Sequence, residues 1–350
     1  MAIVAGFDVH RTQITFDALD TETGELSRGR IESTPDAVRG WAKRFPQADI
    51  HVALEACTGW LFVCEALAAA GAVPHLADPA EAAAQRGRKR RAKTDRADAC
   101  HLRQLLAEGR LPEAWIPPAH VREWRSRARL RKTLVDERGQ WLQRSQWLQR
   151  IQATLFHHGV PASSVPERLL EKRGRAWLEQ VALPAAARER ITVALALVDA
   201  LERQLTPLER ELRRIAGRQS GCRALQERHF GLGATTALTI LCELGDVSRL
   251  SASRKAVRAV GLDVGVHRSD RRSRVGRLTK QGSPHARWAL YEAAQSACRR
   301  TSPDHQAYQA LKARGLSHTR ASLTIARKLA RRCFHTLREL GPAALEPIDD

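Results

Sequence analysis

The sequence predicts a mixed α/β domain over residues 1–118, followed by mainly helical segments. Short apolar or alternating runs, bounded by turn residues, recur through the first 118 residues, as in strands that alternate with helices. From about residue 121 these runs give way to leucines at helical spacing. A chain of 350 residues has ample core for two or three domains.

The first domain begins with three closely spaced strands, which favour an antiparallel meander. Thr34 and Pro35 then have the residue types of a helix N-cap and first turn. The predicted strands are 2–8, 13–19, 25–33, 49–54 and 73–77, and the predicted helices are 35–45, 60–70, 79–85 and 95–108. This order is that of a ribonuclease H-like mixed sheet, and Pro117-Pro118 forms a natural end for it.

A helical arm is predicted over residues 119–220. Apolar residues recur at helical spacing over 121–157 and 185–217, and residues 159–166 interrupt them. Two long helices around a loop predict an antiparallel coiled-coil hairpin or a dimerising arm. Pro207 is expected to kink the second helix or to start a new one.

A basic, helical C-terminal domain with frequent glycines is predicted over residues 221–340, and residues 341–350 are expected to form a tail. The segment 230–237 resembles the hairpin of a helix-hairpin-helix element. Gly231 and Gly233 would let backbone N–H groups approach a phosphate at the start of the next helix. An ordinary tight turn explains the same two glycines.

The charge of the chain indicates a polyanionic partner. Lys and Arg number 58 against 38 Asp and Glu, a formal net charge of +20, which is typical of nucleic-acid-binding proteins. The residues expected to contact nucleic acid are Arg88, Lys89, Arg90, Arg91, Lys93, Gly231, Gly233, Arg268, Arg271, Arg272, Arg274 and Lys280.

The seven cysteines are scattered and form no CxxC pair, which argues against a disulfide framework or a zinc site. No apolar run approaches the roughly 18 residues that a membrane span needs. We therefore expect a cytoplasmic protein without a membrane partner.

Four acidic residues have the spacing of a metal site. Asp95 and Asp98 would share one face of a helix, and Asp8 and Glu55 end two strands that are neighbours in a ribonuclease H-like sheet. Four carboxylates from three elements could hold two Mg²⁺ ions for phosphoryl transfer. Each acid also has a simpler explanation, as a turn residue, a helix cap or a solvated helix start.

Three motifs carry a family resemblance. Gly6-Phe7-Asp8-Val9-His10, residues 54–60 (LEACTGW) and residues 93–99 (KTDRADA) resemble the DEDD transposases of the insertion-sequence-110 family. The N-terminal domain of that family resembles RuvC, the Holliday-junction resolvase. The resemblance implies that Asp8, Glu55, Asp95 and Asp98 are the catalytic, metal-binding tetrad.

Ser269 lies among several arginines, where positive charge would favour an alkoxide and hold a phosphate. A solvated loop serine in a phosphate-binding patch is the alternative. Residues 261–263 (GLD), Ser269 and residues 278–283 (LTKQGS) are similar to the C-terminal domain of the same family, in which a serine at this position is the nucleophile. The family usually has Gly after this serine, whereas this chain has Asp270, a carboxylate that would oppose an approaching phosphate.

The resemblance implies a transposase that cleaves and exchanges strands of donor and target DNA through a covalent serine–DNA intermediate. It further implies a bacterial, nucleoid-associated homo-oligomer, a dimer or tetramer, guided by a bridge RNA encoded by the element. Two alternatives stay open. One is a RuvC-like resolvase or nuclease that hydrolyses DNA with water, and the other is a non-catalytic RNA- or DNA-binding scaffold.

Overall fold

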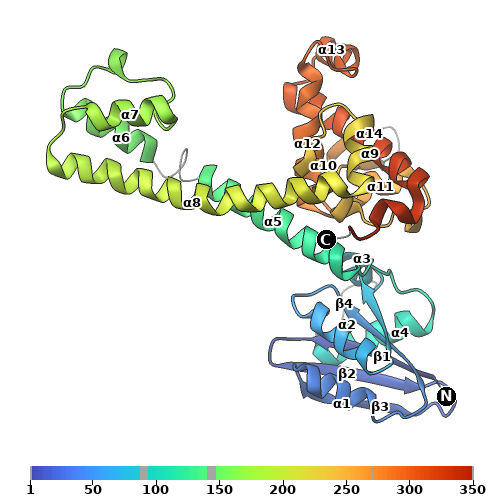
Figure 1. Ribbon diagram of the computed structural model, residues 1–350. Helices are drawn as coiled ribbons and strands as arrows, with labels where there is room; N and C mark the ends of the chain where they lie inside the picture. The colour runs from blue at the N-terminus through green and yellow to red at the C-terminus, as the bar shows by residue number, and fades with distance from the viewer. Residues whose placement is uncertain (1, 87–93, 140–146, 270–271, 349–350) are drawn as a thin grey trace. The chain divides into compact units, whose positions relative to one another are not determined.

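The computed structural model describes residues 2–86, 94–139, 147–269 and 272–348, with the backbone alone for 147, 266–269 and 272–277. The chain forms two compact units, Met1–Ile116 and Pro117–Asp350, which are described separately. Figure 1 shows a sheet with helices in the first unit and a mainly helical second unit. No helix among the described residues is long and apolar enough to cross a membrane.

A five-stranded mixed sheet forms the centre of the first unit. Its strand order is β3-β2-β1-β4-β5, with β1 antiparallel to β2 and parallel to β4. The strands are β1 Ala2–Val9, β2 Gln13–Asp20, β3 Leu26–Glu32, β4 Asp49–Glu55 and β5 Val73–Ala77. The helices are α1 Pro35–Ala42, α2 Trp60–Ala69, α3 Pro79–Ala84 and α4 Asp95–Ala107. The predicted α/β class is therefore confirmed.

The two faces of this sheet are covered by different helices. On one face Phe7 and Leu54 pack in a core with Trp41 of α1, whose ring meets that of Phe7 edge to face at 4.8 Å. On the other face Ala53 packs against Leu102 of α4. Because strand side chains alternate, residues two apart in β1 or β4 face the same layer.

Helix α4 lies directly on the backbone of β1 because Gly6 has no side chain. A Cβ at Gly6 would overlap the carbonyl oxygen of Ala99 and lie 2.6 Å from the backbone nitrogen of Arg103. The same face carries Asp17 of β2, which is fully buried between Arg103 and Arg28 of β3. The Arg28 Nε–Asp17 Oδ2 distance is 2.6 Å. A close backbone approach and a buried ion pair thus fix α4 on the sheet.

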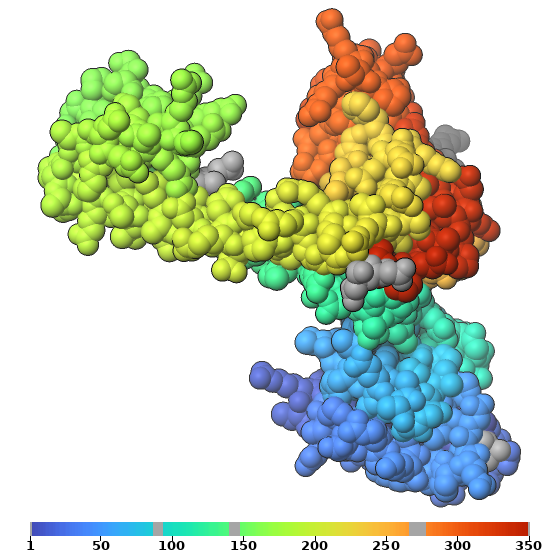
Figure 2. Space-filling view, in the orientation of Figure 1, coloured from blue at the N-terminus to red at the C-terminus, as the bar shows by residue number. Residues whose placement is uncertain are grey.

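The second unit begins with an arm in which α5 (Ala119–Gly139) and α8 (Ala185–Arg218) run antiparallel. Three ion pairs join them in antiparallel order: Arg127–Glu211, Arg131–Glu209 and Arg138–Glu202, at 3.4, 2.7 and 2.7 Å. Figure 2 shows α8 in yellow-green at the surface along the arm. Helix α8 continues through Pro207, so no new helix starts there.

The tip of the arm has a small core of its own. Helices α6 (Trp147–His157) and α7 (Lys172–Gln180) pack on the start of α8. Ile151, Leu178 and Ile191 are buried together there. Helix α7 was not predicted from the sequence, because its apolar residues form one short run, Ala176-Trp177-Leu178, without a helical repeat.

The C-terminal domain is mainly helical, as predicted, but it contains a β-hairpin that the sequence analysis missed. Its helices are α9 Ser220–Arg228, α10 Ala234–Leu244, α11 Ser253–Ala259, α12 Pro284–Gln295, α13 His305–Ala313 and α14 His318–Leu340. Short 3-10 turns occur at Ala162–Ser164, Val247–Arg249, Ser296–Cys298 and Gly341–Leu345. The hairpin pairs β6 (Val264–Ser269) with β7 (Arg272–Leu278) in antiparallel register.

Candidate active site

Asp8 and Glu55 follow neighbouring positions of two parallel strands. Phe7 pairs with Leu54, and each acid is the next residue of its strand. Asp8 shares a face with Gly6, and Glu55 shares a face with Ala53, so both acids belong to the face covered by α4. The sheet therefore confirms that these two acids lie at the ends of adjacent strands.

The other two acids begin α4. Thr94 caps this helix, accepting a hydrogen bond from the backbone N–H of Ala97 at 3.2 Å, so Asp95 and Asp98 lie in the first turn. Ala99, which contacts Gly6, is one turn after Asp95 on the same face. The contact at Gly6 therefore holds the first turn of α4 beside Asp8, two residues further along β1.

His10 joins two of the four acids. Its Nε2 lies 3.1 Å from Asp8 Oδ2 and 3.5 Å from Asp95 Oδ1. One ligand atom from each of the three side chains lies within 4.8 Å of the other two, close enough for one metal ion. His10 was not among the site residues predicted from the sequence, where its one local signal is its place directly after the first strand.

Arg86 joins the other two acids. Its guanidinium donates to Asp98 Oδ1, and its Nη2 lies 3.8 Å from Glu55 Oε1. Arg86 was not among the site residues predicted from the sequence. It lies just after α3, beside the carboxylates. Residues Arg88, Lys89, Arg90, Arg91 and Lys93 lie outside the described residues.

The electrostatics of the cluster favour a cation. Burial raises the pKa of Asp8, His10 lowers it, and the nearby charges of Asp98 and Asp95 raise it again, with the net pKa above the ordinary value. Thr15, opposite Asp8 in the β1–β2 ladder, is buried, and its hydroxyl has no hydrogen-bond partner among the described atoms. A hydrated divalent ion would relieve the repulsion and give this hydroxyl a partner.

The second unit contains the remaining predicted site residues. Ser269 is the last residue of β6 and pairs with Arg272 across the hairpin. The side chains of Ser269, Arg268, Arg272 and Arg274, and all of Arg271, lie outside the described residues. Lys280 is exposed two residues after β7, with φ of +55°.

The two glycines before α10 have structural roles. Gly231 has φ of +89°, and a Cβ there would lie 2.5 Å from the carbonyl oxygen of Ala293 in α12. Gly233 is the N-cap of α10, and its N–H donates to Thr236 Oγ1 at 3.0 Å. Both observations agree with the tight-turn explanation, and the predicted contact of these glycines with nucleic acid stays a prediction.

The comparisons with known proteins agree with this arrangement. Residues 5–154 match the family model of DEDD-type IS110 transposases, and residues 223–310 match the model described as the transposase IS116/IS110/IS902 family. No curated protein matches the chain. The two models together define a DNA transposase, an enzyme of DNA recombination. The chain belongs to the IS110 family of transposases.

A divalent metal is the cofactor that this family assignment indicates. The residues of the first unit fit one: Asp8, Asp95, Asp98 and Glu55 offer the carboxylate oxygens that hard cations prefer, and His10 adds a nitrogen ligand. The four acids come from β1, β4 and α4, so the sheet and helix have to be assembled before the ligands can meet.

Proposed function

We propose that this transposase cleaves and exchanges DNA strands with Ser269 as nucleophile and with Mg²⁺, two ions per site, held by Asp8, Glu55, Asp95 and Asp98. The observation that supports the metal site most directly is the convergence of the four acids around His10 and Arg86. When bound, the metal would lower the charge of the attacked phosphate and of the leaving oxygen.

The covalent step involves residues of the second unit. Ser269 Oγ would form a bond to the phosphorus of a DNA phosphodiester, giving up its proton. The bond from phosphorus to one deoxyribose oxygen would break, and that oxygen would leave as a hydroxyl after taking a proton. The arginines on the hairpin, Arg268, Arg272 and Arg274, would hold the phosphate by charge and paired hydrogen bonds.

The partners of this reaction are donor and target DNA and, on the same proposal, a bridge RNA encoded beside the open reading frame. Strand exchange needs two DNA sites at once, which supports a homo-oligomer. The formal charge of +20 supports binding to both kinds of nucleic acid.

The test is a strand-exchange assay on supercoiled plasmids that carry the element ends, with Mg²⁺ and an RNA transcribed from the flanking DNA. Ser269→Ala should abolish both exchange and the covalent protein–DNA adduct seen on a denaturing gel. Ser273→Ala, four residues away, is the matched control and should retain both. Asp8→Asn should abolish cleavage altogether, and omission of the RNA should abolish target choice.

A second candidate is a nuclease of the resolvase type that uses water as nucleophile. It is favoured by one observation: all four acids, together with His10 and Arg86, lie within the single compact unit Met1–Ile116. For this candidate, Ser269→Ala would leave cleavage intact. If instead Asp8→Asn left every activity intact, the protein would be a non-catalytic nucleic-acid scaffold.

A further inference from the structure

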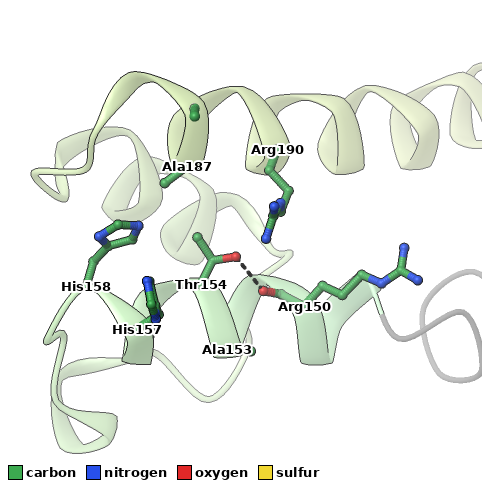
Figure 3. A pocket seen from close by; sticks show the side chains of 8 residues that line it. Arg150, Ala153, Thr154, His157, His158, Ala187 and Arg190 are labelled. Atoms are coloured by element: carbon green, nitrogen blue, oxygen red, sulfur yellow. Dashed lines mark hydrogen bonds between the residues drawn. The ribbon is translucent and has the colours of Figure 1, made fainter.

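A basic pocket lies between α6 and α8 at the tip of the arm. Its cavity is about 460 Å³, within the range of small-ligand sites. Figure 3 shows Arg190 directed from α8 toward α6, with the two histidines at the opposite end from Arg150. The lining residues used in the argument are Arg150, Thr154, His157, His158, Ala187 and Arg190.

The charge of Arg190 in this pocket is not balanced by an acid of the described chain. Of the described residues, none that lines it is acidic, and Arg190 has no acidic partner in the described part of the chain. Other arginines of the tip are engaged: Arg175 pairs with Asp199, and Arg188 donates to the carbonyl oxygens of Leu178 and Val181. Arg190 thus presents to the pocket a positive charge that the described part of the fold does not use.

The remaining walls are suited to an anion as well. The rings of His157 and His158 are exposed and stand at 83°, with centroids 5.1 Å apart, so their N–H groups have different directions. Thr154 is buried at the base, where its hydroxyl donates to the carbonyl oxygen of Arg150 at 2.7 Å and keeps its lone pairs. Ala187 brings the first turn of α8, whose N-terminus has no side-chain cap, to the pocket wall.

We propose that this pocket binds a backbone phosphate of a nucleic-acid strand, so that the tip of the arm is a nucleic-acid contact apart from the acidic cluster. The guanidinium of Arg190 matches phosphate oxygens in charge and in paired hydrogen bonds, and the exposed rings of His157 and His158 offer N–H donors from the facing helix. A nucleic acid is the polyanion that a transposase meets. The proposal depends neither on Ser269 nor on a metal, so it stands or falls separately from the strand-exchange mechanism.

The test measures binding by the full-length protein in EDTA, which removes any contribution from the metal site. The probes are a fluorescent single-stranded RNA, a fluorescent DNA duplex and inorganic phosphate, each titrated at several salt concentrations. The variant is Arg190→Gln. Arg173→Gln is the matched control, because Arg173 is an exposed arginine of α7 outside the pocket.

We expect Arg190→Gln to weaken binding of at least one strand about tenfold, the loss of one charged hydrogen-bonded contact. It should also lower the slope of log K against log salt by about one. The control should change the dissociation constant less than twofold, and the strand that loses affinity identifies the ligand as RNA or DNA. Circular dichroism checks that both variants are folded.

Three results would overturn the proposal. Equal losses in both variants would show only a general effect of charge. An unchanged affinity for both strands, with inorganic phosphate binding lost, would make this a small-anion site. An unchanged affinity for all three probes, with a shift in oligomeric state by light scattering, would make it a protein contact.

Discussion

Gly6 of β1 and Ala99 of α4 lie in direct backbone contact, so a Cβ at Gly6 would overlap the Ala99 carbonyl oxygen. Because Asp8 follows Gly6 by two residues, and Asp95 precedes Ala99 by one helical turn, this contact sets the separation of two acids of the cluster. A residue with no functional group thus determines the geometry of the site.

Gly6→Ala should lower the free energy of unfolding by about 3 kcal/mol, because the overlapping atoms are backbone and cannot rotate away. It should also weaken divalent-metal binding by moving α4 off β1. Urea unfolding and calorimetric titration with Mn²⁺ would measure the two effects. Gly40→Ala is the control: its site in α1 is open, so stability should rise by about 0.5–1 kcal/mol. Equal effects of the two changes would contradict the packing argument.

His10→Ala should weaken Mn²⁺ binding more than Mg²⁺ binding, because imidazole nitrogen suits Mn²⁺ better than Mg²⁺. We expect about a tenfold increase in the Mn²⁺ dissociation constant, the size of change typical of altered metal surroundings. Calorimetric titration of both ions would check it. His335→Ala, an exposed histidine of α14, should have no effect. A loss of equal size for both ions would make His10 a positioning residue for Asp8 and Asp95.

Arg86→Met should lower the stability of the metal-free protein. It should also increase the stability that the protein gains when it binds a metal. Without the guanidinium, Asp98 and Glu55 lose their shared positive neighbour, and we expect a cost of about 1 kcal/mol because Arg86 is partly exposed. Thermal unfolding would be measured without metal and with Mn²⁺ at about ten times its dissociation constant. The increase in Tm caused by Mn²⁺ should be larger for the variant than for the unchanged protein. Arg110→Met removes a surface pair with Glu108 and should change neither value.

Glu243→Gln should destabilise the second unit by about 2 kcal/mol, because the side chain of Glu243 in α10 is only 4% exposed and its carboxylate accepts two hydrogen bonds from Arg129. Glu339→Gln, in a surface pair with Arg228, is the control and should cost less than about 0.5 kcal/mol. Urea unfolding of the full-length chain at pH 7 would compare them. A cost at Glu243 no larger than that at Glu339 would contradict the importance of the buried pair.

The same residue predicts a pH dependence. Burial alone would raise the pKa of Glu243, but the hydrogen bonds and charge of Arg129 and the charge of Arg125 outweigh it, so the pKa lies below the ordinary value. Because the carboxylate of Glu243 has a lower pKa in the folded state, it stabilises the fold at any pH above its pKa in the unfolded chain, which is about 4.3. This stabilisation is lost as the pH falls through the pKa of the folded state. The stability difference between the unchanged protein and Glu243→Gln should therefore be constant from pH 6 to 8 and shrink below about pH 4.

Much of the first unit could be predicted from the sequence because its signals are local. Alternating runs marked the strands, and the predicted cap at Thr34 is confirmed by its hydrogen bond from Ala37 N–H. The hairpin of β6 and β7 was missed because arginine, serine, glycine and histidine fill most of its positions, which leaves too few apolar residues to mark two half-buried strands. Helix α7 was missed because its apolar residues form a single short run rather than a helical repeat.

The candidate site was predictable only in part. Asp8, Glu55, Asp95 and Asp98 could be placed because each stands at the boundary of a recognisable element. His10 and Arg86 could not, because their contacts depend on how β1, α3 and α4 meet in space, and neither residue has a local pattern. The role of Ser269 is still a prediction from family resemblance.

The length of helix α8 can be compared with one turn of duplex DNA. Arg190 and Ile215 lie on this one uninterrupted helix, 25 residues apart, or about 38 Å at about 1.5 Å per residue. One turn of duplex DNA advances by about 34–36 Å. If the tip holds a phosphate at Arg190, α8 would fix that phosphate at about the length of one duplex turn from the residues around Ile215.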